Sequence, residues 1–255
     1  MRDVSLEGGA TDVVRGANYP TLPRNGEVVE DIEHQLPPRP SQNPKPHKDY
    51  VQCNPPKPPT YRKFTVFTAG SIEMGKAVNW QPLMATLLNR LPITMCNPRK
   101  GKWDQSITQQ AKDEFFKQQV VWELEALEQA DVICFFFDVR TMSPVSLLEL
   151  GRWMDSDKIV VCCGEKYWKS GNVHIMCERY GVTCVETFEE LVPEVEKILK
   201  KKGMALDDEG DLIGENVHVP KEKPKKKTQL EEKIAELQKQ VDELLAEKKT
   251  AQPSM

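Results

Sequence analysis

The sequence predicts an α/β domain built on a doubly wound parallel sheet of five strands. Apolar runs with strand character alternate with helical segments between residues 63 and 202, which is the pattern of repeated strand–helix units. The runs are continuously apolar, as expected of parallel strands that helices cover on both faces. This region of about 140 residues is long enough to form one substantial core.

Each element follows from its local pattern. We expect the strands at residues 64–69, 92–96, 132–138, 158–163 and 182–186. We expect the helices at residues 82–91, 109–129, 144–154 and 188–201, with a short one at residues 173–180. In open parallel sheets the ligands bind beyond the carboxyl ends of the strands, so the loops that follow the strands are where chemistry is sought.

The regions outside this domain have a different composition. Residues 1–62 are polar and rich in proline without periodicity, so we expect an extended arm that adds little stability and binds a partner. Residues 203–227 form a polar linker that ends in a basic run. Residues 228–249 should form a short coiled-coil helix, although a single solvated helix is the alternative. The heptad positions are Leu230, Ile234, Leu237, Val241 and Leu244.

Composition excludes several classes of protein. The formal net charge is −4, so no basic excess favours nucleic acid as a partner, and no apolar run approaches the length of a membrane span. The seven cysteines form no CxxC motif and no signal peptide precedes them, which favours a reducing cytoplasmic location. Cys162 and Cys163 are adjacent on a strand and point to opposite faces. The pair cannot bind one metal ion together, so we expect no metal site. We also expect no cofactor.

Two acids define the first candidate site. Asp138 directly follows the apolar run at residues 132–137, so it should lie at the ligand-binding edge of the sheet. Ser143 is expected to cap the next helix, with Pro144 in its first position. Glu149 then lies about two turns into that helix, among leucines. A catalytic carboxylate is one interpretation, and the polar stripe of an amphipathic helix is the other.

The loop after the first predicted strand, residues 70–77, nearly matches a phosphate-binding P-loop. Gly70, Gly75 and Lys76 have the required spacing. Ala77 breaks the motif because a P-loop needs a hydroxyl there to bind the metal, and the helical pattern also begins too late. The glycines still allow a ligand close to the backbone, where amides bind a phosphate or a sugar hydroxyl.

The loop after the second predicted strand, residues 96–106, contains several polar and aromatic side chains that could contact a ligand beyond the strand end. Asn97, Arg99, Trp103 and Asp104 are its candidate binding residues. Trp103 is suited to stack on a planar base while Asp104 bonds to the edge of the base. The alternative is a surface loop whose tryptophan packs on the domain.

Taken in order, these motifs resemble the nucleoside 2-deoxyribosyltransferase-like family over residues 64–182. The resemblance extends over about half the chain. No single motif identifies the family, but the occurrence of all of them in the same order does. The matching motifs are FTAGSIEMG, WQ at residues 80–81, NPRKGKWD, QVVWELEALEQADV, SPVSLLELG and GNV at residues 171–173.

The resemblance implies a flavodoxin-like sheet and a glutamate nucleophile that attacks the anomeric carbon of a nucleoside or nucleotide. That glutamate is Glu149, and the covalent glycosyl enzyme is resolved by a second base or by water. By the same resemblance, Asp104 orients the base and assists its protonation, Asp138 lines the pocket, and Ser71 contacts the sugar or a 5′-phosphate. The residues expected to contact the substrate are Gly70, Ser71, Asn97, Arg99, Trp103, Ser146 and Asn172.

Departures from the family pattern leave a second hypothesis open. The early loop carries Ser71, Ile72 and Glu73 where better-known transferases present an aromatic residue, so a phosphorylated substrate is conceivable. Those enzymes also complete the site across a subunit interface, which makes a homo-oligomer a further expectation. The alternative function is an assembly component, for example of a cytoskeletal or ciliary complex, in which an enzyme-derived domain docks through the arm and the coiled coil.

Overall fold

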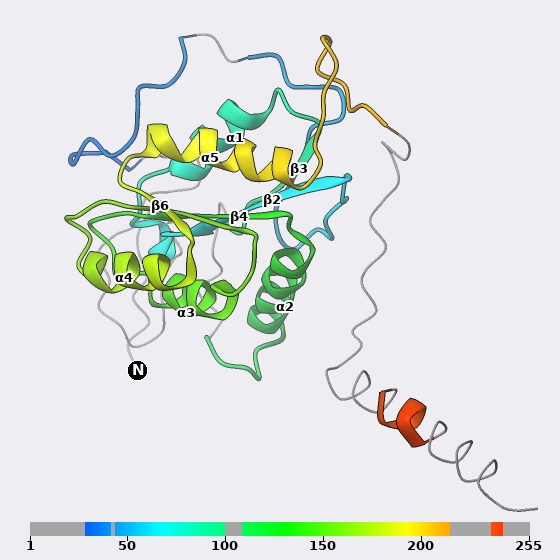
Figure 1. The fold of residues 1–255 in the computed structure, drawn as a ribbon. Coiled ribbons are helices and arrows are strands. Elements are labelled where there is room, and N and C mark those ends of the chain that lie inside the picture. The colour runs from blue at the N-terminus through cyan, green and yellow to red at the C-terminus, as the bar shows by residue number, and fades with distance from the viewer. Residues whose placement is uncertain (1–28, 42–43, 100–108, 215–235, 242–255) are drawn as a thin grey trace, which may run out of the picture. The chain divides into compact units, whose positions relative to one another are not determined.

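A computed structural model describes residues 29–41, 44–99, 109–214 and 236–241. The chain divides into two compact units, Met1–Lys221 and Glu222–Met255, which are treated separately. The first unit contains the α/β domain, and all of the numbered helices and strands belong to it (Figure 1).

The sheet has six parallel strands in the order β1-β3-β2-β4-β5-β6. The order β3-β2-β4-β5-β6 is that of the flavodoxin-like fold, so this part of the fold prediction is confirmed. The five expected strands are all present, and the prediction of five is one too few. The strands are β1 (Val51–Cys53), β2 (Phe64–Gly70), β3 (Ile93–Cys96), β4 (Val132–Phe137), β5 (Ile159–Cys163) and β6 (Thr183–Val185).

The additional strand, β1, lies within the segment 1–62 that the sequence assigned to an extended arm. It pairs with β3 in the register Val51 to Thr94. A strand of three residues at the edge of a sheet is too short to show a periodic pattern. The prolines that follow it also argue against a strand when the sequence is considered alone. The indole N–H of Trp122 also donates to the backbone carbonyl of Lys57 at 2.7 Å. Part of the arm therefore packs on the domain.

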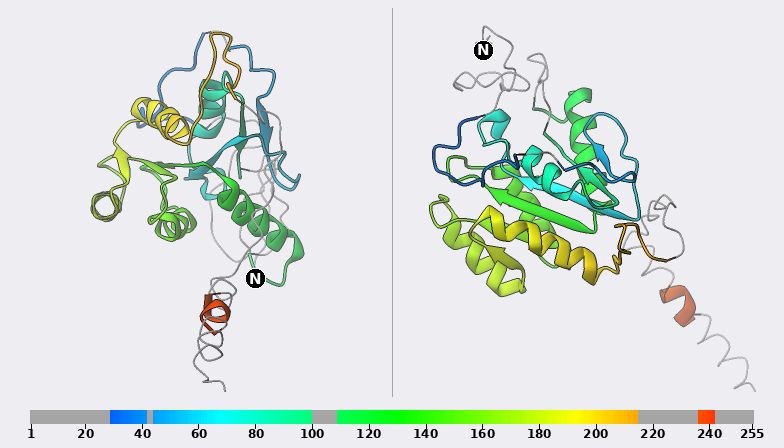
Figure 2. Two further views of the ribbon diagram at one scale, coloured as in Figure 1. Left: turned by 45° about the vertical axis from the view of Figure 1, so that its right-hand side comes forward. Right: turned by 90° about the horizontal axis from the view of Figure 1, so that it is seen from above.

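Helices cover both faces of the sheet (Figures 1 and 2). α1 (Trp80–Leu88) and α5 (Phe188–Lys201) pack on one face, and α2 (Glu114–Gln129), α3 (Pro144–Trp153) and α4 (Ser170–Tyr180) pack on the other. The strands are buried on both sides, which explains their continuous apolar sequences. A short 3₁₀ turn, η1 (Glu73–Gly75), follows β2.

Several details of the helices differ from expectation: α1 and α4 each begin a few residues earlier than predicted, and α1 also ends earlier. α2 begins at Glu114 rather than near residue 109, because the Asp113 carboxylate accepts hydrogen bonds from the N–H groups of Phe115 and Phe116 and caps the helix there. Ser143 precedes α3 as expected but provides no side-chain cap. Its backbone has φ 49°, and its hydroxyl instead lies 2.7 Å from that of Ser71, the residue directly after β2.

In the second unit only residues 236–241 are described, and they are helical. Leu237 and Val241 are about half exposed, while Leu230, Ile234 and Leu244 lie outside the described residues. The coiled coil therefore stays a prediction. None of the helices in the described part of the chain combines the length and apolar character that crossing a bilayer requires.

Candidate active site

The topological switch point of the sheet lies between β2 and β4, where strand order reverses. β2 ends at Gly70, which has φ +115° and lies against the backbone of Phe136 in β4. A Cβ atom at this position would lie 2.2 Å from the Phe136 carbonyl oxygen. Only glycine therefore allows β2 and β4 to approach this closely at the candidate site.

Three hydroxyl groups form a buried cluster at this point. The Ser71 hydroxyl lies 2.7 Å from that of Ser143 and 2.8 Å from that of Thr141, and it accepts a hydrogen bond from the Asp138 N–H at 2.9 Å. Ser71, Thr141 and Ser143 are all buried. The cluster ties the loop after β2 to the loop after β4. The predicted contact of Ser71 with a substrate stays a prediction.

Asp138 lies at the carboxyl end of β4, as its sequence position indicates, and it is buried. Its carboxylate accepts hydrogen bonds from the backbone N–H groups of Val78 and Arg140 and from the side-chain amide of Gln35. Three charge-assisted hydrogen bonds of this kind stabilise a buried carboxylate. In this structure Asp138 therefore holds together the arm, β4 and the loop before α1.

Glu149 lies on α3, one turn beyond Ser146. The Ser146 hydroxyl donates to the Gly70 carbonyl at 2.7 Å, so this face of α3 packs against the end of β2. Burial removes water from the Glu149 carboxyl and, together with the negative charge of nearby Glu123, raises its pKa from 4.5 to about 8. A carboxyl group perturbed to this extent beside a switch point is a candidate for catalysis.

Glu123 on α2 is a residue that the sequence did not single out. Its carboxylate accepts a hydrogen bond from the Gln119 side-chain amide, which also donates to the Pro98 carbonyl at 3.3 Å. These contacts join α2 to the loop after β3. The Glu123 charge also acts on Glu149 of α3, whose pKa it helps to raise, and the two residues are called the acid pair below. The signal available in the sequence was weak, because α2 carries several other glutamates.

The loop after β3 supports the loop after β2. The Asn97 side chain accepts a hydrogen bond from the Arg99 N–H, and the Arg99 guanidinium donates to the carbonyls of Gly75, Ala77 and Val78 at 3.1–3.2 Å. This network uses a planar cation with several donors to hold several carbonyl groups at once. Arg99 thereby fixes the shape of the segment between β2 and α1.

The other predicted site residues are not brought into this cluster by the described structure. Asn172 is exposed near the beginning of α4. Trp103 and Asp104 lie outside the described residues, so their contacts with the base stay predictions. The residues that the structure does bring together around the end of β2 are Gly70, Ser71, Asp138 and Ser146, and Glu149 follows on the same helix as Ser146.

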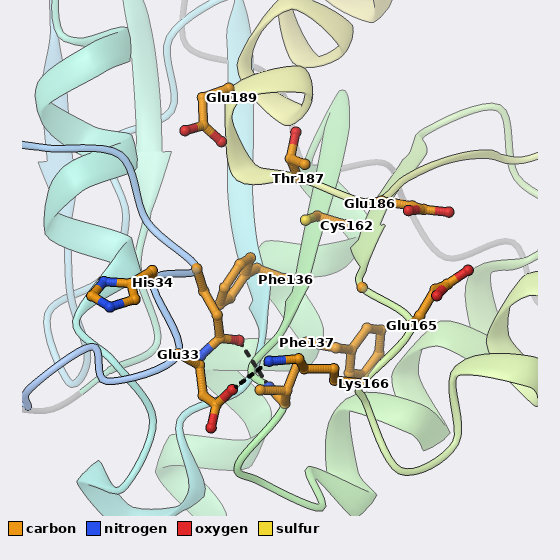
Figure 3. Close-up of a pocket in the computed structure, with 13 residues that line it drawn as sticks. Glu33, His34, Phe136, Phe137, Cys162, Glu165, Lys166, Glu186, Thr187 and Glu189 are labelled. Atoms are coloured by element: carbon orange, nitrogen blue, oxygen red, sulfur yellow. Dashed lines mark hydrogen bonds and ion pairs between the residues drawn. The ribbon is translucent and has the colours of Figure 1, made fainter.

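A cavity of about 410 Å³ lies beyond the carboxyl ends of β4 and β5. Figure 3 shows Phe136, Phe137 and Cys162 at its base, with Glu165, Glu186 and Glu189 around it. Arm residues 33–35 line one side, and the Lys166 ammonium group donates to the Glu33 carboxylate at 2.9 Å. The sequence did not predict this cavity, because its arm residues are distant in the chain from the strand ends.

One group of side chains in the described structure has the composition of a metal site. Ligand atoms of His47, Asp49 and Asp211 lie within 4.8 Å of one another. Their polar atoms already have partners, because Asp211 bonds to His47 and Lys48, and the Asp49 N–H donates to His47. This group is explained as an ion-pair cluster that joins residues 47–49 to the hairpin near residue 211.

Part of the domain matches a known protein family. Residues 63–167 match the model of the family described as "Nucleoside 2-deoxyribosyltransferase like". The resemblance is confirmed over this segment. The nucleoside 2-deoxyribosyltransferase-like match includes Glu123 and Glu149 and ends before the GNV motif at residues 171–173. At the level of the family it supports nucleoside glycosyl transfer. No curated protein matches the chain.

Proposed function

We propose that this domain transfers or hydrolyses the N-glycosidic bond of a nucleoside or nucleotide through a covalent intermediate on Glu149. The observation that carries the proposal is the half-buried Glu149, whose pKa the charge of Glu123 helps to raise, beside the switch point of a sheet whose sequence matches the family. Glycoside chemistry commonly uses two carboxyl groups, one as nucleophile and one as acid. The pair supplies both groups, one from α2 and one from α3.

The pair also accounts for how the two roles are divided. Two neighbouring carboxyl groups in a site with little water retain one proton between them. In the free protein the raised pKa of Glu149 means that this group holds a proton near neutral pH. Positive charge that develops at the anomeric carbon during reaction favours ionised Glu149, while the proton is held by Glu123.

In the reaction, a Glu149 oxygen forms a bond to the anomeric carbon as the bond to the base nitrogen breaks. The electron pair of the broken bond leaves with the base, and a proton from Glu123 neutralises it. A second base, or water, then attacks the anomeric carbon, releases the Glu149 carboxylate and returns a proton to Glu123. The sequence predicts that Asp104 orients the departing base and assists its protonation, and in this proposal Glu123 is the source of the proton.

The test is to trap the intermediate. We expect the full-length protein, incubated with 2-fluorinated nucleoside analogues, to gain the mass of one fluorinated sugar on the peptide that contains Glu149. Glu149→Ala should abolish both the adduct and cleavage of natural nucleosides, since it removes the attacking oxygen. Glu178→Ala, which changes an exposed glutamate on α4, is the matched control and should behave as wild type.

A second candidate function is supported by the position of the arm. Gln35 bonds to Asp138 at the carboxyl end of β4, so a segment expected to bind partners covers part of the edge where ligands bind. The alternative is an assembly component, for example of a cytoskeletal or ciliary complex, with a docking domain, partner-binding arm and paired C-terminal helix. A folded protein that forms no adduct and cleaves no nucleoside supports this candidate and contradicts the enzymatic one.

A further inference from the structure

Three free thiols gather between α4 and the strands β5 and β6. Cys163 at the end of β5, Cys177 in α4 and Cys184 in β6 pack in one apolar cluster. In the register of the two strands, Cys184 lies opposite Val161. Both side chains belong to this cluster, so Cys184 points to the face of the sheet that α4 covers. The fold thus brings cysteines from three different elements together.

The turn after α4 brings Cys177 and Cys184 into contact. Gly181 caps the helix with φ +66°, which allows the chain to reverse direction. The Val182 N–H then donates to the Cys177 carbonyl at 2.9 Å, and β6 begins at the next residue. Because the chain returns over the last turn of α4, the thiols of Cys177 and Cys184 form a hydrogen bond. Such proximity is the first requirement for a disulfide.

The two thiols differ in their access to solvent. Cys177 is 1% exposed, whereas Cys184 is partly exposed. All seven cysteines of the chain lie in the described residues, and Cys184 is the only one of them that is not buried. An oxidant in the solvent therefore reaches Cys184 first, and Cys177 is the thiol behind it.

The surroundings also make Cys184 the more acidic thiol. The hydrogen bond from Cys177 lowers the pKa of Cys184, and the charge of His174 lowers it further. Burial and the charge of Glu186 act in the opposite direction but do not cancel this effect. The His174 ring is held by a contact of 2.7 Å between its Nε2 atom and the Cys163 carbonyl. Since the thiolate is the reactive form of cysteine, Cys184 is the nucleophile of the pair.

The other five cysteines lack these features. All of them are buried. Burial raises the pKa of four of these thiols, which are Cys53, Cys134, Cys162 and Cys163. Buried thiols of this kind react slowly with oxidants, so oxidation should be selective for Cys184.

We propose that Cys184 is a site of reversible oxidation with Cys177 as its resolving partner, and that hydrogen peroxide converts the pair into a disulfide that joins α4 to β6. The Cys184 sulfur attacks one peroxide oxygen and becomes a sulfenic acid as the O–O bond breaks. The other oxygen leaves as hydroxide and takes up the proton that Cys184 had released. This inference is independent of the proposed function.

The second step uses the neighbouring thiol. The Cys177 sulfur bonds to the Cys184 sulfur, and the proton of Cys177 leaves with the sulfenic hydroxyl as water. In total the two thiols lose two electrons, and one peroxide is reduced to two molecules of water. A thiol reductant such as dithiothreitol reverses the reaction by exchange.

The experiment treats the full-length protein with hydrogen peroxide near neutral pH and locates the products by mass spectrometry of its peptides. Dimedone, which labels sulfenic acids, is present in parallel samples. The variants are Cys177→Ser and Cys184→Ser. The matched control is Cys162→Ser, which changes a buried cysteine of β5 on the opposite face of the sheet. Thermal unfolding checks that each variant is folded.

We expect wild type and Cys162→Ser to form a disulfide between Cys177 and Cys184 that dithiothreitol removes. Cys177→Ser should keep the sulfenic acid, so dimedone should label Cys184. In Cys184→Ser the first oxidation of any cysteine should be at least about tenfold slower than in wild type, because the accessible thiolate is lost.

The absence of this disulfide from oxidised wild type would overturn the proposal, as would a disulfide from Cys184 to Cys163. Oxidation that begins at another cysteine would overturn the assignment of Cys184 as the nucleophile. If Cys177→Ser does not fold, wild type quenched with dimedone at early times gives the same information. The label should then appear on Cys184, and a label on Cys177 instead would reverse the two roles and contradict the proposal.

Discussion

Replacing Glu149 with glutamine should make the protein more stable at neutral pH while abolishing its activity. Burial and the charge of Glu123 raise the pKa of Glu149 in the folded state to about 8 from 4.5. Between these two values the folded protein holds a proton that the unfolded chain releases. The free energy of unfolding therefore falls as pH rises through this window. Glutamine does not titrate, so Glu149→Gln removes this loss.

The expected magnitude follows from the pKa shift. Each pH unit inside the window lowers the free energy of unfolding by about 1.4 kcal/mol. From pH 5 to pH 7, wild type should therefore lose about 2.5 kcal/mol more than Glu149→Gln. The assay is urea denaturation at half-unit steps from pH 5 to 8. Because the proposed reaction uses the one proton that the pair retains, kcat/KM of wild type should fall as pH rises above about 8, by about tenfold per unit.

The control is Glu178→Gln, whose substituted carboxyl group is exposed on α4, and its pH dependence should parallel that of wild type. The Glu123→Gln variant should reduce the pH dependence only in part, because burial is the larger cause of the shift. Identical stability curves for Glu149→Gln and wild type across this range would show that the folded protein does not disfavour the ionised carboxylate, and the reasoning from burial would be wrong.

Two further predictions concern the architecture. Gly70→Ala should lower the free energy of unfolding by about 2–4 kcal/mol, because its Cβ would lie 2.2 Å from the Phe136 carbonyl oxygen; an unchanged denaturation midpoint would contradict the close approach of β2 and β4. A chain that begins at Lys63 should unfold at a lower temperature than the full chain, because it lacks β1 and leaves the Trp122 indole N–H without its Lys57 acceptor. Calorimetry checks this, and an unchanged midpoint would support the original division at residue 62.

The strands and helices of the domain were predictable because their patterns are strong and local. β4 consists of six consecutive buried residues. The start of α5 is marked by Thr187 and Glu190, which form a capping box in the structure. β1 was not predictable because three residues show no period, and its place depends on pairing with β3. Helix starts shifted by a few residues where a side chain such as that of Asp113 determines the first turn.

The candidate site was predictable only in part. Glu149 was recognised because a carboxyl among leucines is unusual and because the motifs resemble a family. Glu123 could not be distinguished in sequence from the neighbouring acids of α2, since the selection depends on which of these acids lies near enough to Glu149 to raise its pKa. Asp138 and Ser71 were expected to face a ligand, and in the structure their hydrogen bonds are to other protein groups.

The hydrogen bonds of Gln35 connect parts of the chain that are more than 100 residues apart in sequence. Its amide group bonds to both the Asp138 carboxylate and the Val139 N–H, and Asp138 in turn holds the Val78 N–H of the loop before α1. A partner that pulls residues 29–41 away must break the hydrogen bonds of Gln35 to Asp138 and Val139. Because Asp138 also binds the Val78 N–H, this changes the free energy of the loop before α1. By thermodynamic reciprocity, a ligand that reshapes the loop alters the affinity of the arm for its partner by the same factor.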